Sequence, residues 1–128
     1  NERVTTHLKK ALDIFTTLAE NEQASPMLRE KAIFRQAKTY ERMDRDAAAI
    51  QAYLDIVYQY GLDMQEEKVR DWYYLVRAGY DVCDLLVTEE RFREAARIYE
   101  RIARIGVPTS DEARQRAEEI RQAHGLRE

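Results

Sequence analysis

Ala49-Ile50-Gln51-Ala52-Tyr53, in the middle of the chain, has counterparts in Ala11-Leu12-Asp13-Ile14-Phe15 and Ala95-Ala96-Arg97-Ile98-Tyr99. Each stretch begins with an alanine that an aromatic residue follows four positions later. Residues four apart lie on one face of an α-helix. A small residue lets a neighbouring helix approach closely, while the aromatic ring fills the adjoining gap. The chain is therefore predicted to repeat one helical unit.

The composition favours one all-α domain. The 128 residues are 45% hydrophobic and 35% charged, a balance that builds a single modest core. Only four glycines and two prolines interrupt the chain, and no alternating strand pattern occurs. Asp plus Glu (24) exceed Lys plus Arg (21), so the net charge of -3 argues against a nucleic-acid partner. The single cysteine excludes a disulfide framework within this chain.

Apolar periodicity and capping residues predict about six helices. Ser25-Pro26 is expected to start the second helix, and Asp63 with Glu66 and Thr109 with Glu112 form capping boxes for two others. The fourth helix is expected to be unusually long, with two apolar stripes that pack on two sides. The expected ranges are about 3–21, 26–43, 46–60, 64–88, 92–105 and 109–124.

Two stretches resemble the first helix of a tetratricopeptide repeat (TPR): residues 32–40, Ala-Ile-Phe-Arg-Gln-Ala-Lys-Thr-Tyr, and residues 72–76, Trp-Tyr-Tyr-Leu-Val. The alanine-to-aromatic stretches are similar to the second TPR helix. Gln36 and Val76 depart from the family pattern, and the alanines at 11, 49 and 95 are 38 and 46 residues apart, against about 34 in the family. The resemblance covers about residues 8–105.

This resemblance implies a right-handed superhelical array of antiparallel helix hairpins, with residues 109–125 as a capping helix. The Ser-Pro start and the Ala-x-Phe-Arg-x-Ala run are also similar to bacterial envelope TPR proteins of the outer-membrane assembly lipoprotein and Tol-Pal coordinator types. We expect residues 1–128 to form one such domain, a soluble piece of a larger protein that is cytoplasmic or periplasmic. No apolar stretch is long enough for insertion into a membrane.

The resemblance further implies a concave groove, lined by the second and fourth helices, that binds a protein or peptide partner. Aromatic rings alternate with cations along it, which suits an acidic or aromatic segment. The alternative is that the rings are packing residues and the charges a solvated face. Lys38 occupies the asparagine position of the carboxylate clamp, so a chaperone-tail receptor is not predicted. The lining residues are Lys31, Phe34, Lys38, Glu41, Arg42, Tyr73, Arg77, Tyr80 and Asp84.

Two other surfaces have competing interpretations. The first helix has no partner helix before it, so we expect a missing helix from the parent protein or a homodimer through this helix. Arg93, Arg97, Arg101 and Arg104 follow one side of the fifth helix. Because Glu94 and Glu100 interleave with them, a solvated face is favoured over a patch for an acidic partner.

No catalytic, cofactor or metal site is predicted. His7 and His124 lie near opposite ends of the chain, outside any metal-binding motif, and Cys83 occupies a packing position. The sequence therefore predicts a non-catalytic interaction scaffold. The alternatives are a spacer or oligomerisation segment of a larger protein and, third, a helical-bundle enzyme or small-ligand domain.

Overall fold

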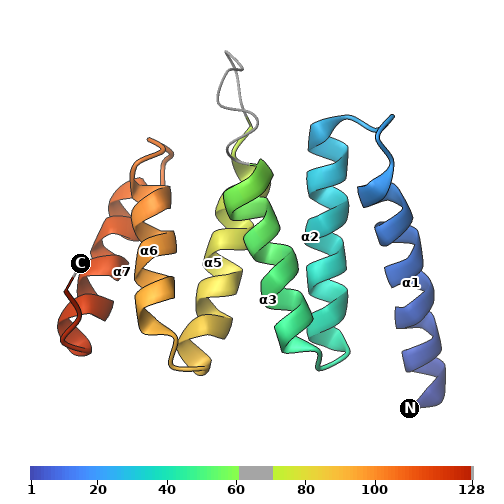
Figure 1. Cartoon of the computed structure of the whole chain (residues 1–128), viewed down its shortest axis with the longest axis horizontal. Coiled ribbons are helices and arrows are strands. Elements are labelled where there is room, and N and C mark those ends of the chain that lie inside the picture. Colours follow the sequence, from blue (N-terminus) through green and yellow to red (C-terminus); the bar gives the residue numbers. More distant parts are fainter. Residues whose placement is uncertain (61–70, 128) are drawn as a thin grey trace. The chain divides into compact units, whose positions relative to one another are not determined.

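A computed structural model describes residues 1–60 and 71–127, and these residues form helices and connections without any strand (Figure 1). The predicted all-α class is confirmed. No helix among these residues is long and apolar enough to cross a membrane. The helices are α1 (Glu2–Glu20), α2 (Pro26–Arg42), α3 (Asp46–Leu54), the π-helical η1 (Asp55–Tyr60), α5 (Tyr73–Thr88), α6 (Phe92–Ala103) and α7 (Ser110–Ala123).

The chain divides into two compact units, Asn1–Ala78 and Gly79–Glu128, and α5 begins in the first and ends in the second. In the first unit, α1 packs against α2 and α2 against α3, with neighbours running in opposite directions (Figure 1). In the second unit, α6 and α7 form an antiparallel pair. The prediction of one TPR-like domain remains a prediction.

Small residues bring the helices of the first unit together. Ala37 of α2 and Ala49 of α3 are fully buried, and so is the ring of Tyr53 four residues after Ala49. The predicted start of α2 is confirmed, because the Ser25 hydroxyl accepts a hydrogen bond from the backbone N–H of Leu28 (3.2 Å) and Pro26 opens the helix. The alanine-to-aromatic pattern thus marks a helix contact in α3.

The third predicted helix is α-helical only to Leu54 and continues as a π-helix over Asp55–Tyr60. Ile56 and Val57 are fully buried. Two adjacent apolar residues fit an i→i+4 and an i→i+5 backbone equally well, so periodicity could not distinguish them.

The prediction of an unusually long fourth helix is wrong. Asp71 and Trp72 are not helical, and α5 has 16 residues against 19 in α1. The Asp71 carboxylate accepts a hydrogen bond from the backbone N–H of Tyr73 (2.9 Å), which satisfies one of the first donors of a helix starting there. Residues 64–70 of the expected helix, with the capping pair Asp63 and Glu66, lie outside the described residues.

The second unit is built on a close approach of α5 and α6. A Cβ on Gly79 would lie 2.7 Å from Cδ1 of Ile102, so only glycine fits there without a shift of the isoleucine. The apolar stripe of α6 is buried from Ala95 to Ala103. Phe92 departs from it: the ring is half-buried and stacks on His124, with centroids 3.4 Å apart.

The capping box predicted for the last helix is wrong. Thr109 makes no side-chain cap bond, and its buried hydroxyl has no hydrogen-bond partner among the described residues. Ser110 makes the local bonds instead: its hydroxyl donates to the Ile102 carbonyl (2.9 Å) and accepts from the N–H groups of Gly106 (3.2 Å) and Val107 (2.9 Å). The hydroxyls of Thr109 and Ser110 are adjacent in sequence. Packing against α6 decides that Ser110 makes these hydrogen bonds.

Ser110→Ala is expected to lower the free energy of unfolding by about 1–3 kcal/mol, because it leaves the N–H groups of Gly106 and Val107 without their partner. Thr109→Val, the matched control, removes a buried hydroxyl without a bond and should change that free energy by less than about 0.5 kcal/mol. Urea unfolding of both variants measures this. Equal losses would contradict the assignment of Ser110.

Candidate partner-binding site

Five of the residues predicted to line the groove gather in the first unit, around the ring of Phe34. That ring lies 6.0 Å from the ring of Tyr53 and 5.5 Å from the ring of Tyr74, measured between centroids. We call this group the α2–α5 cluster. Its members are Phe34, Lys38 and Glu41 of α2, Tyr53 of α3, and Tyr73, Tyr74 and Arg77 of α5.

Helical spacing places these side chains together. Phe34, Lys38 and Glu41 are four and three residues apart, so they share one face of α2. Tyr73 and Arg77 are likewise four apart on α5, and Arg77 Nη1 donates a hydrogen bond to the Tyr73 hydroxyl (2.8 Å). The two faces meet because Tyr74 packs against Phe34.

Two cations lie over the aromatic rings. Lys38 Nζ is 5.6 Å from the ring centre of Phe34 and 5.7 Å from that of Tyr53. The guanidinium carbon of Arg77 is 5.1 Å from the ring centre of Phe34 and 5.7 Å from that of Tyr73. All four distances lie within the range of cation–π attraction. The rings therefore hold both cations in place.

Glu41 is the carboxylate of the α2–α5 cluster. It lies 3.6 Å from Lys38 Nζ and accepts a hydrogen bond from the Tyr53 hydroxyl. Among the seven residues of the cluster, Lys38 and Arg77 carry two positive charges and Glu41 carries one negative charge.

Exposure separates accessible from supporting members of the α2–α5 cluster. Phe34 is only 4% exposed and Tyr53 is fully buried, so these rings support the cations from inside. Tyr73 is 50% exposed, the Lys38 side chain is 38% exposed, and Arg77 is exposed. Such a surface offers N–H donors and a ring face to a carboxylate or an aromatic side chain.

The other four predicted residues do not join these contacts. Lys31 and Arg42 lie on α2, outside the contacts of the cluster among the described residues. Tyr80 and Asp84 belong to the second unit. There the Tyr80 ring packs edge-on against Tyr99, with centroids 5.3 Å apart. Its hydroxyl donates to the Thr109 carbonyl (3.4 Å), and burial raises its pKa.

Sequence reasoning missed Arg116, which joins these tyrosines. Its Nη1 donates to the Tyr99 hydroxyl (3.2 Å), and its guanidinium carbon lies 5.0 Å from the ring centre of Tyr80. Arg116 also pairs with Glu112 (2.8 Å), four residues earlier on α7. Tyr99 and Arg116 lie 17 residues apart on different helices, so no local spacing signalled the contact.

Cys83 occupies the packing position that the sequence predicted. It is fully buried, and its thiol donates a weak hydrogen bond to the Ala95 carbonyl (3.4 Å). Burial raises the pKa of this thiol to about 12. A protonated, enclosed thiol is a poor nucleophile. Among the described residues, no three His, Cys, Asp or Glu side chains come together as a metal site would require.

No protein-family model matches the chain, and no curated protein or solved structure matches it significantly.

The pKa values of the second unit predict a stability change at alkaline pH. Burial raises the pKa of Cys83 from 9.0 to about 12 and that of Tyr99 from 10.0 to about 12. Because the unfolded chain loses these protons first, the free energy of unfolding should fall as the pH rises from about 9 to about 12. Each group lowers the free energy of unfolding by at most about 1.4 kcal/mol per pH unit.

Cys83→Ala removes the thiol's part of this dependence. Urea unfolding between about pH 8.5 and pH 10, where the thiol's part begins before that of Tyr99, should give a flatter decline for Cys83→Ala than for the unaltered chain. Equal slopes for the two proteins would contradict the raised pKa of the thiol.

Proposed function

We propose that this chain is a non-catalytic, TPR-like protein-interaction module that binds an acidic peptide segment at the α2–α5 cluster. The observation that carries the proposal is the pair of accessible cations, Lys38 and Arg77, held over the buried ring of Phe34. In this proposal the helix hairpins belong to a right-handed superhelical array, and the cluster lies on its concave side.

Pre-organisation is the physical support for binding at this surface. A free arginine or lysine side chain loses rotamer freedom when it binds a partner. Here the Arg77 guanidinium is already oriented by a hydrogen bond to Tyr73 and by the ring of Phe34. A guanidinium stacked on a ring keeps donors at its edge for a carboxylate.

The exposed ring of Tyr73 supplies the apolar part of the proposed contact. Tyrosine and arginine are among the residue types most often found at the energetic centres of interfaces. Tyr73 and Arg77 stand four residues apart on α5, so one peptide side chain can contact both. The proposed ligand is therefore an acidic segment that carries an aromatic or aliphatic residue.

Selection from a library of random peptides displayed on phage tests the proposal. The unaltered chain should enrich acidic sequences, and Arg77→Glu combined with Tyr73→Ala should weaken binding of the selected peptides at least about tenfold. Fluorescence titration with the purified peptides measures the change. Thermal unfolding should show a stability loss below about 1 kcal/mol for the pair, since both side chains are exposed.

The matched control is Arg35→Glu combined with Leu28→Ala. These residues are also exposed, lie on another face of α2, and undergo comparable changes in charge and size. Their substitution should leave peptide affinity within about twofold, because surface changes away from a contact have small effects. Equal affinity for all three proteins would refute the α2–α5 cluster as the binding site.

Self-association through α1 is the second candidate function, and the exposure pattern of α1 favours it. At about 100° per residue, its apolar residues span roughly 160° of the helix circumference. Leu8 and Ala19, near one side of that arc, are buried, while Ile14 at the opposite edge is 65% exposed and Val4 in the middle is 46% exposed. Within the first unit, α2 therefore covers only part of the apolar face.

Sedimentation velocity tests this second candidate. The unaltered chain should be a dimer at about 100 μM, and Ile14→Lys should shift it to monomer, because a charge on the contact opposes burial. Val87→Lys alters an apolar, exposed residue of α5 and should leave the dimer intact. A monomeric unaltered chain at this concentration would exclude self-association through α1.

A further inference from the structure

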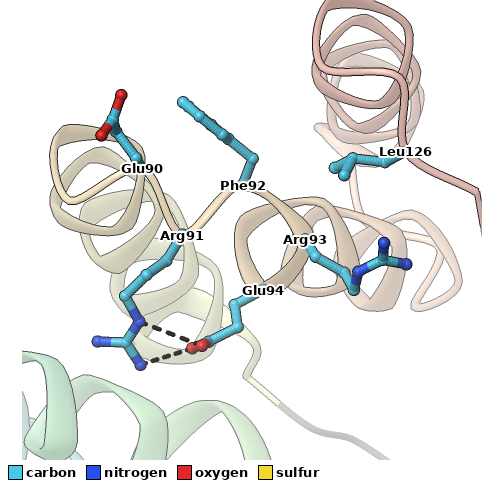
Figure 2. A pocket seen from close by; sticks show the side chains of 6 residues that line it. All are labelled: Glu90, Arg91, Phe92, Arg93, Glu94 and Leu126. Atoms are coloured by element: carbon cyan, nitrogen blue, oxygen red, sulfur yellow. Dashed lines mark hydrogen bonds and ion pairs between the residues drawn. The ribbon is translucent and has the colours of Figure 1, made fainter.

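Glu94 and Glu100, which interleave with the arginines of α6, make their hydrogen bonds with arginines outside that row. Glu94 accepts hydrogen bonds from Nε (3.1 Å) and Nη2 (2.6 Å) of Arg91, which precedes α6 (Figure 2). Glu100 accepts two hydrogen bonds, each 2.8 Å long, from Arg121 of α7. The Arg121 bonds are the main reason that the pKa of Glu100 is lowered. Both carboxylates are engaged outside the row.

Three exposed arginines remain on one line along α6 and its C-cap residue. At about 100° and 1.5 Å per residue, Arg93, Arg97 and Arg104 lie within roughly 40° of arc and span about 16 Å. Arg93 Nη1 donates to the backbone carbonyl of Arg127 (2.6 Å), a neutral acceptor. No carboxylate lies within ion-pair distance of these three residues in the part of the chain that is described. We call them the α6 arginine line.

Glu100 reduces the charge of this surface without cancelling it. Arg97 and Arg104 both contribute to the lowered pKa of Glu100, after the contribution of Arg121. Arg93, Arg97, Arg104 and Arg121 carry four positive charges, and Glu100 carries one negative charge. The surplus lies on an exposed surface, where it can attract and orient an incoming carboxylate.

An apolar recess begins where the α6 arginine line begins. It has a volume of about 220 Å³ and is lined by residues 90–94 and Leu126, so Arg93 belongs to both features. Figure 2 shows Phe92 and Arg93 at the start of α6, with the Leu126 side chain pointing toward this end of the helix. Stacking on His124 holds the Phe92 ring. The recess can take one apolar side chain beside the first arginine.

The choice of basic residue points to carboxylate recognition. Arginine supplies all nine Lys and Arg positions of the stretch 79–128, whereas the stretch 1–78 also uses five lysines. Either residue keeps a surface soluble, but only the planar guanidinium binds a carboxylate through two parallel hydrogen bonds.

We infer that the α6 arginine line and the adjoining recess form a second docking surface, for an acidic segment of another protein that carries a large apolar residue. The charge balance favours a peptide over nucleic acid, because the stretch 79–128 holds eleven acidic residues against nine arginines. A single line of three arginines also contacts few phosphates, whereas nucleic-acid binding needs a broad basic field. This inference does not depend on the α2–α5 cluster.

Fluorescence anisotropy with a labelled oligoglutamate peptide that carries a tryptophan at each end tests the inference on the whole chain. Arg97→Glu combined with Arg104→Glu should weaken binding at least about tenfold, since it reverses two charges of the line. Lys9→Glu combined with Lys10→Glu makes the same charge change on the exposed side of α1 and should alter affinity less than about threefold. The same oligoglutamate with alanine at each end lacks an anchor for the recess and should bind several-fold more weakly.

Repeating the titration in the Arg77→Glu, Tyr73→Ala background separates the two surfaces. The loss caused by Arg97→Glu and Arg104→Glu should persist there, because the α6 arginine line acts without the α2–α5 cluster. Three results would overturn the inference: equal losses in both charge-reversed pairs, no binding of the peptide by the unaltered chain, or tighter binding of a single-stranded oligonucleotide than of the peptide.

Discussion

Close approach of helices at alanine residues is the constraint on which the rest of this structure depends. Ala37, Ala49 and Ala95 are fully buried, and Gly79 lets α5 approach Ile102 more closely than any larger residue would allow. Where helices come this close, the larger residues of the same faces must fill the gaps beside the contact, as Tyr53 and Tyr99 do. The positions of these small residues therefore decide which side chains stay at the surface of the protein.

Both proposed docking surfaces follow from this packing. In the first unit, the buried rings of Phe34 and Tyr53 support cations that a bare helix would leave free to move. In the second, the pairing of α6 with α7 draws Glu100 to Arg121, which leaves the charge of the α6 arginine line in surplus. A local electrostatic character thus arises from helix contacts in a chain whose net charge is only -3.

Local spacing predicted the periodic part of the fold well. The all-α class, the Ser25 cap, the buried stripe of α6 and the enclosed position of Cys83 follow from it, and the structure has them. Local spacing failed at Thr109 and Ser110, two neighbouring hydroxyls that offer similar capping groups, and at the start of α5, where the Asp71 carboxylate caps a helix that begins at Tyr73. Such choices differ by about 1 kcal/mol locally, so tertiary contacts decide them.

The candidate site was also predictable within each helix but not between helices. Residues 34, 38 and 41, and residues 73 and 77, share helix faces by their spacing, so the sequence by itself determined which side chains stand together on each helix. Only the tertiary structure decided that Tyr74 packs on Phe34, that Arg116 joins Tyr99, and that Glu100 pairs with Arg121 rather than with its own helix. The physical reason is range: periodicity acts over one or two turns, whereas these contacts join residues of different helices that lie 17 or more positions apart in the chain.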